Sequence, residues 1–207
     1  MIKKLKSEKD IFEDSSFEGP EGEKLCWNKF RKGDKNAYLY IYNKYSNLLF
    51  RYGRKIIQDR EVVKDAIHDL FVELWKSKHN LGEAASIKNY LLKSLRRKLI
   101  RTLKKNIVIT GEDGLDDYKK EFVLSRENDI ILSEMSDEQK ERLTLALNKL
   151  TPRQKEIVFL LFYDDCPPKE IASIMSLRIR TVYNTIHNAI QVLKKHFTIL
   201  ATIFMFL

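Results

Sequence analysis

Residues 168–190 read Pro168-Lys-Glu-Ile-Ala-Ser-Ile-Met-Ser-Leu-Arg-Ile-Arg-Thr-Val-Tyr-Asn-Thr-Ile-His-Asn-Ala-Ile190. A short helix, a tight turn and a longer helix fit this spacing, which is that of a helix-turn-helix. The second helix of that motif can lie in the major groove of a DNA duplex. Its predicted core face consists of Val182, Ile186, Ala189, Ile190 and Leu193.

The other face of this second helix is polar and basic. The side chains on or near it are Arg178, Arg180, Thr181, Asn184, His187 and Asn188. Arginine suits guanine edges and phosphates, and asparagine can pair with adenine through two hydrogen bonds. We expect several of these residues to contact only phosphate, which positions the helix without reading sequence. Tyr183 is expected to pack rather than to read bases.

Another helix is predicted directly upstream of this motif. Thr151 is a suitable N-cap, Pro152 suits the first helical position, and Gln154 stands at the capping-box position. Helical periodicity also precedes it, from about residue 138 to residue 150.

The composition favours helices and an anionic partner. The 207 residues include only 7 Gly and 4 Pro, and the net charge is +9. Such a charge points to nucleic acid before membrane. Residues 112–141 contain 11 acidic and 4 basic residues, a net of −7, so the rest of the chain is more basic still. This acidic stretch is predicted to be a linker, with a short helical stretch near residues 122–132.

A helix predicted from about residue 86 to residue 105 carries a second basic face. Its leucines, at 91, 92, 95, 99 and 103, cluster on one side. The opposite side carries Tyr90, Lys93, Arg97, Arg101 and Lys104, and no acidic residue occurs between Glu83 and Glu112. An ordinary solvated face is one interpretation. The other interpretation is a surface that binds separated DNA strands. It is favoured because the basic side chains repel one another without an acidic residue to compensate them, and because an aromatic ring lies among them.

The preceding helix has an acidic row beside two apolar rows. One apolar row is Val62, Ala66, Leu70 and Leu74, and the other is Val63, Ile67, Phe71 and Trp75. The acidic row is Glu61, Asp65, Asp69 and Glu73. Like charges at this spacing repel, so the row is either a wet helix face or a docking surface for a basic protein. Further upstream, one periodic stretch runs from about Trp27 to Tyr52, and Gly53 and Gln58-Asp59 are expected to allow a break or bend.

No catalytic or metal-binding arrangement is evident, so we expect no enzyme, cofactor, metal or small-molecule substrate. Cys26 and Cys166 form no Cys-x-x-Cys pair. The first residues lack the apolar stretch of a signal peptide, and the apolar residues after 197 are too few to span a bilayer, so a cytoplasmic location is expected.

The quoted motifs together resemble a bacterial RNA polymerase sigma factor of the extracytoplasmic-function (ECF) type. The resemblance covers about residues 24–105 and 140–196. It implies that the acidic row binds core RNA polymerase, at the beta-prime clamp, and that the helix-turn-helix domain reads the −35 element of promoter DNA. The beta flap and an anti-sigma factor, in this family often membrane-bound, are the other implied partners.

The resemblance also assigns the segment around residue 90 to the −10 element. It implies that the loop from residue 78 to residue 85 pockets an unstacked base. The implied −10 contacts are Lys78, His79, Asn80, Tyr90, Lys93, Arg97, Arg101 and Lys104. The chain departs from the family pattern at Ser176, where a turn glycine is usual, and at Arg178, where a serine cap is common.

The expected architecture is all-α, with two small helical domains joined by a flexible acidic linker. The expected divisions are a flexible N-terminal arm (1–22), a first domain (23–105), the linker (106–138), the helix-turn-helix domain (139–197) and an apolar tail (198–207). Two other functions fit the residues alone. One is a stand-alone helix-turn-helix regulator that binds duplex operator DNA unaided, and the other is a helical adaptor that binds an acidic protein.

Overall fold

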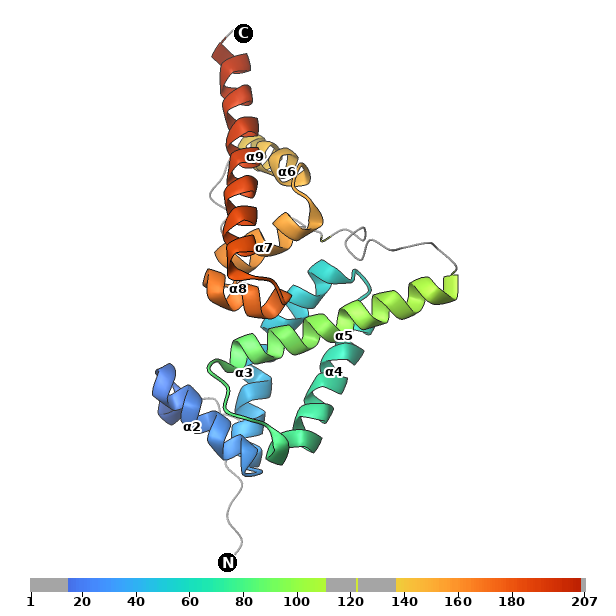
Figure 1. Cartoon of the computed structure of the whole chain (residues 1–207), viewed down its shortest axis with the longest axis vertical. Coiled ribbons are helices and arrows are strands. Elements are labelled where there is room, and N and C mark those ends of the chain that lie inside the picture. Colours follow the sequence, from blue (N-terminus) through green and yellow to red (C-terminus); the bar gives the residue numbers. More distant parts are fainter. Residues whose placement is uncertain (1–14, 111–121, 123–136, 206–207) are drawn as a thin grey trace, which may run out of the picture. The chain divides into compact units, whose positions relative to one another are not determined.

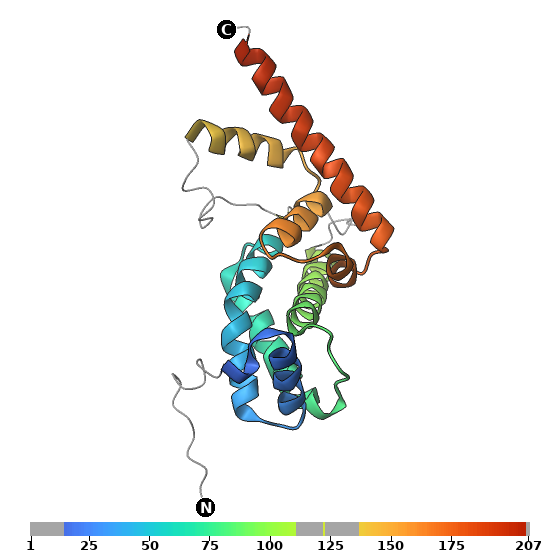
Figure 2. The ribbon, with the colours of Figure 1, turned by 90° about the vertical axis from the view of Figure 1, so that its left-hand side faces the viewer.

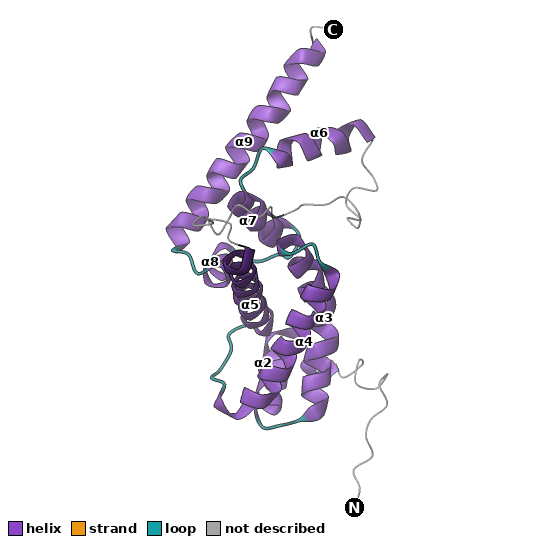
Figure 3. Ribbon diagram, turned by 90° about the vertical axis from the view of Figure 1, so that its right-hand side faces the viewer, coloured by secondary structure: helices purple, strands orange, loops and turns teal. Residues whose placement is uncertain are grey.

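The computed structural model describes residues 15–110, 122 and 137–205, and helices are the only regular elements within these ranges (Figure 1, Figure 3). The chain divides into two compact units, at residues 1–103 and 104–207. Within the described ranges, no helix is both long enough and apolar enough to cross a membrane. The predicted all-α class with two helical units is therefore confirmed.

The described part of the first unit is a bundle of four helices with two short 3-10 turns. Its elements are η1 (Ser15–Phe17), α2 (Gly19–Arg31), α3 (Lys35–Ile56), α4 (Arg60–Ser77), η2 (Lys78–Asn80) and α5 (Ile87–Thr110). The core forms where the apolar rows of α3, α4 and α5 meet. Buried side chains such as Leu49, Phe71 and Leu95 come from the three helices in turn. The apolar side chains predicted on α4 and α5 lie in this core, except for the half-buried Val62, Trp75 and Leu103.

Two predicted helix limits in the first unit are wrong. The periodic stretch from Trp27 to Tyr52 is two helices, because the chain turns at Gly33, whose φ is +90°, and restarts where the Asp34 carboxylate accepts hydrogen bonds from the next amides. Of the two places predicted to allow a break, the chain breaks at Gln58-Asp59, because α3 ends at Ile56 and α4 begins at Arg60, whereas Gly53 does not break α3. It lies inside that helix, where a Cβ atom would stand 2.7 Å from Val63 Cγ1. Gly53 therefore allows close packing rather than a bend.

The predicted N-terminal arm is too long. Helix α2 begins at Gly19. Pro20 disrupts the interior of a helix but is well suited to its first turn, so it favours a helix start at this point. Phe17 is buried, and its ring meets that of Tyr40 edge to face, with 5.1 Å between the centroids. At least residues 17–22 thus belong to the folded unit.

The second unit consists of α6 (Asp137–Asn148), α7 (Pro152–Phe162), α8 (Pro168–Met175) and α9 (Ile179–Met205). The first three all pack against α9 (Figure 2). The predicted capping box is confirmed: Thr151 Oγ1 accepts from the Gln154 amide, and the Gln154 side chain accepts from the Thr151 amide at 2.8 Å. Of the predicted core face of α9, Val182 and Ala189 are fully buried, whereas Ile186, Ile190 and Leu193 are half-buried.

The limits of the linker and the tail also differ from prediction. Helix α5 continues to Thr110, since no glycine or proline interrupts it before Gly111. Helix α9 likewise contains no glycine or proline, and it continues to Met205. The helical stretch expected near residues 122–132 lies outside the described residues except for Phe122. That side chain is buried, and its ring meets the Phe159 ring edge to face at 5.7 Å.

Candidate nucleic-acid and protein interfaces

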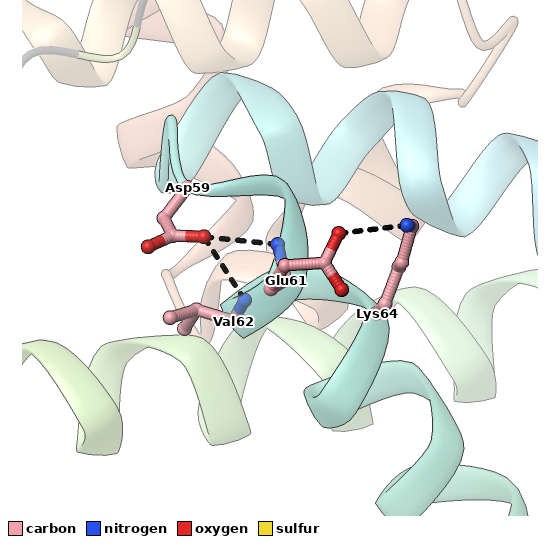
Figure 4. A network of polar contacts seen from close by, with 4 residues as sticks. All are labelled: Asp59, Glu61, Val62 and Lys64. Atoms are coloured by element: carbon pink, nitrogen blue, oxygen red, sulfur yellow. Dashed lines mark hydrogen bonds and ion pairs between the residues drawn. The ribbon is translucent and has the colours of Figure 1, made fainter.

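The acidic row lies on α4 with all four carboxylates exposed. The helix begins at Asp59, whose carboxylate accepts hydrogen bonds from the amides of Glu61 and Val62 (Figure 4). The Glu61 side chain forms an ion pair with Lys64 at 2.7 Å, one turn along the same helix (Figure 4). The negative charge at the N-terminal end of the row is therefore partly neutralised.

The other end of the acidic row is paired as well. Lys98 of α5 lies 2.6 Å from Glu73. Asp65 and Asp69, between the two paired glutamates, have no hydrogen-bond or ion-pair partner among the residues that the structure describes. Two adjacent turns of α4 thus present uncompensated negative charge, which a positively charged surface of another protein could neutralise.

The basic row lies on the side of α5 that faces away from the core. Arg97, Arg101 and Lys104 are exposed, whereas Lys93 is half-buried. The leucines at 91, 95 and 99 on the opposite side are fully buried. The structure therefore presents the predicted cationic surface on α5, with guanidinium groups one helical turn apart and available to phosphates.

Tyr90 is less accessible than a free stacking platform would be. Its ring is half-buried and packs on the Trp27 ring of α2, with 5.3 Å between the centroids. The indole N–H of Trp27 donates a 2.9 Å hydrogen bond to the Gly82 carbonyl. Trp27 thus contacts both the proposed stacking residue and the loop before it. Sequence reasoning missed this role, because Trp27 was placed only in an apolar row.

The loop residues proposed for the −10 element begin with η2. The Lys78 ammonium donates to the Trp75 carbonyl at 3.1 Å and lies 4.3 Å from the Trp75 ring centroid, so it stabilises the end of α4. His79 and Asn80 are exposed. Of these three residues, Lys78 already has an intramolecular role, and the other two are free to contact a ligand from their exposed positions.

The outer face of α9 carries the predicted duplex contacts. Five of the side chains are exposed and Thr181 is half-buried; the exposed ones are Arg178, Arg180, Asn184, His187 and Asn188. The expectation that Tyr183 packs is wrong, because its side chain is 56% exposed on the same face. The helical repeat explains this: Tyr183 lies one turn before His187, which is also exposed, so both point away from the core.

The turn before α9 is formed without glycine. Ser176 adopts a left-handed conformation, with φ 55° and ψ 42°, and the Leu177 amide donates to the Ala172 carbonyl at 2.9 Å. The Arg178 carbonyl then accepts from the Thr181 and Val182 amides, which places Arg178 at the N-cap position of α9. The departures at Ser176 and Arg178 are therefore accommodated within a helix-turn-helix.

Both units match models of the same protein family. Residues 41–107 match the family model "Sigma-70 region 2", and residues 140–193 match "Sigma-70, region 4". A curated relative, the "ECF RNA polymerase sigma factor SigX" of Bacillus subtilis, is 22% identical over 172 residues, which are 80% of this chain and 86% of the relative.

Two solved structures share the fold at 16% identity. One is CnrH in complex with the cytosolic domain of CnrY, with a TM-score of 0.56 over 83% of this chain and 94% of that one. The other is the sigma factor RpoE in complex with the anti-sigma factor NepR, from Bartonella quintana, with a TM-score of 0.53 over 76% of this chain and 94% of that one.

A region 2 bundle with an acidic and a basic helix, followed by a region 4 helix-turn-helix, defines a promoter-specificity subunit of RNA polymerase. The chain belongs to the sigma-70 family and is a sigma factor of the ECF type. It therefore binds core RNA polymerase and promoter DNA and directs the initiation of transcription.

Proposed function

We propose that the acidic row of α4 is the principal docking surface for core polymerase. The observation that carries this proposal is the exposure of Asp65 and Asp69 without an intramolecular partner in the described part of the chain. Carboxylates placed one turn apart cost repulsion in the free protein. A basic surface on the polymerase would remove that cost and add charge-assisted hydrogen bonds.

The basic row of α5, with Tyr90 and the loop from residue 78 to residue 85, would hold the −10 element. Separating base pairs costs a few kcal/mol per unstacked step. Phosphate neutralisation by Arg97, Arg101 and Lys104 would offset part of this cost, and a pocketed base would offset more. Because Tyr90 already packs on Trp27, a base would stack on an aromatic pair that is fixed in advance.

The exposed face of α9 would bind the −35 element as a duplex. Arg178 and Arg180 lie at the start of the helix, where side chains of a recognition helix contact base edges. Asn184 and Asn188, one turn apart, are suited to adenine, and His187 to phosphate. In this division of roles the polymerase supplies the chemistry of RNA synthesis. The chain supplies binding and positioning, in the cytoplasm and without a cofactor.

Regulation by an anti-sigma factor is the second part of the proposal. RpoE, which shares the fold, was solved in complex with the anti-sigma factor NepR, and CnrH in complex with the cytosolic domain of CnrY. A protein partner that covers either DNA-binding surface would keep this chain from promoters. Such a partner would be released when transcription is needed.

Reconstitution with core polymerase tests the docking surface. We expect Asp65→Arg/Asp69→Arg to lose core binding and promoter-directed initiation, because two attractive charges become repulsive. Glu61→Arg is a control of the same charge type at a position already paired with Lys64, and it should have a smaller effect. Circular dichroism should show an unchanged helical fold. Unimpaired initiation by the double variant would contradict the assignment.

A further inference from the structure

Helix α2 carries a carboxylate at the start of the helix proposed to bind the −10 element. Glu23 Oε1 accepts a 3.0 Å hydrogen bond from the amide of Ile87, the first residue of α5. The same oxygen accepts a 2.9 Å hydrogen bond from the hydroxyl of Tyr45, which is buried in α3. A carboxylate at this position satisfies a free backbone donor and interacts favourably with the helix dipole.

Trp27 lies one turn after Glu23 on the same helix. Its indole N–H donates to the Gly82 carbonyl at 2.9 Å, and its ring packs on Tyr90. Trp27 is almost fully buried, at 2% exposure, so its position is set by the core. The two residues of α2 therefore hold Gly82 and Ile87, at the two ends of the segment that leads into α5.

The end of α2 also lies beside η2. A Cβ atom on Gly33, which follows this helix, would stand 3.5 Å from Lys78 Cε and 3.8 Å from His79 Cε1. From η2 to the start of α5, the loop thus meets α2 or the turn after it at three places. Residues 19–31 precede the segment, 41–107, that matches the region 2 family model.

We propose that Glu23 and Trp27 are positioning residues for −10 recognition. They fix the loop between η2 and α5, and with it Tyr90, in the geometry that receives separated DNA. This proposal rests on the proposed assignment of that surface to the −10 element. Its physical basis is that a loop fixed before binding does not lose conformational entropy when a base enters it.

The test uses the full chain in holoenzyme, with Glu23→Ala, Trp27→Phe and the control Glu21→Ala. Glu21 is an exposed carboxylate on α2. Phenylalanine at position 27 keeps an aromatic ring in the core but is smaller than the indole and has no N–H to donate. The probe is a duplex promoter that the wild-type holoenzyme selects from a library randomised at the −10 element. A second template carries the same promoter with the −10 segment mispaired, so that its strands are already separated.

We expect the rate of open-complex formation on the duplex template to fall about threefold to tenfold for Glu23→Ala and Trp27→Phe, because each variant loses the one hydrogen bond that its side chain makes to the segment from Gly82 to Ile87. Discrimination between the selected −10 sequence and single-base changes should fall as well. The mispaired template should show a smaller rate loss. Core affinity should remain unchanged, and Glu21→Ala should match wild type throughout. Glu23→Gln keeps an acceptor oxygen and should restore most of the discrimination.

A purely structural role predicts a different result. Discrimination per folded, core-bound molecule would then be unchanged, and that outcome overturns the proposal. The double variant Arg97→Ala/Arg101→Ala, tested beside these variants, distinguishes a failure of the positioning role from a failure of the −10 assignment itself. If it weakens promoter opening while Glu23→Ala and Trp27→Phe do not, only the positioning role is wrong. If it too has no effect, the −10 surface is wrongly assigned and the positioning role is overturned with it.

Discussion

Lys98 Nζ lies 2.6 Å from Glu73 Oε1, and this ion pair joins α5 to α4 across the first unit. The acidic and basic helices are therefore in direct electrostatic contact at the end of the acidic row. Glu73 is 68% exposed, so the pair contributes at most about 1 kcal/mol to stability. Its larger consequence concerns binding, because it divides the acidic row into paired and unpaired carboxylates.

This division predicts unequal contributions to core binding. Glu73 is already neutralised by Lys98, so Glu73→Gln should weaken core affinity less than about threefold, whereas Asp69→Asn should weaken it by about tenfold. Both substitutions remove one charge and preserve the side-chain size. Titration of labelled variants with core polymerase measures the two affinities, and equal losses would contradict the division.

Gly53→Ala should destabilise the first unit by about 1–3 kcal/mol. The added methyl group would stand 2.7 Å from Val63 Cγ1, so Val63 or the helix α4 that carries it would have to move away from α3. Gly82→Ala is the control, because a Cβ atom there has nothing within 4 Å. Urea unfolding followed by circular dichroism checks both variants. A neutral Gly53→Ala would contradict the close packing.

Ser176→Gly should stabilise the second unit by about 0.5–1 kcal/mol. Ser176 has φ 55°, a conformation that is costly for a residue with a Cβ atom and not for glycine. Ser176→Ala retains that cost and should bring no gain. The melting temperatures of the three proteins measure the difference. A gain with alanine equal to the gain with glycine would mean that the backbone conformation is not the cause.

Burial raises the pKa of the Cys26 thiol to about 12, from an ordinary value of 9.0. Above pH 9 the unfolded chain releases this proton while the folded chain keeps it, so the free energy of unfolding should fall as pH rises between about 9 and 12. Cys26→Ala removes this contribution. The wild type should thus lose more stability than the variant between pH 7 and pH 10 in urea titrations, and parallel losses would contradict the assignment.

Local patterns were sufficient to predict much of this fold. The rows on α4, the leucine face of α5 and the Thr151 capping box depend on residues within a few turns of one another, and the structure contains all three. The resemblance to sigma factors added the order of the two units. The helix-turn-helix followed from spacing even though Ser176 replaces the usual glycine.

Contacts between distant residues could not be predicted in this way. Trp27 meets Gly82 and Tyr90, and Phe122 meets Phe159, only because separate helices bring them together. No periodicity within one segment encodes such pairs. For the same reason the candidate site was predicted as charged and aromatic faces, whereas the residues that hold its loop in place were not.

The central claim is that this chain needs core polymerase to select a promoter. Anisotropy of a labelled promoter duplex at about 0.15 M salt measures this directly, with the purified chain alone and with core polymerase present. We predict weak, sequence-independent binding by the chain alone, and selective binding followed by strand opening when core is added. Selective saturation of the duplex by the chain alone, without association with core, would contradict the account.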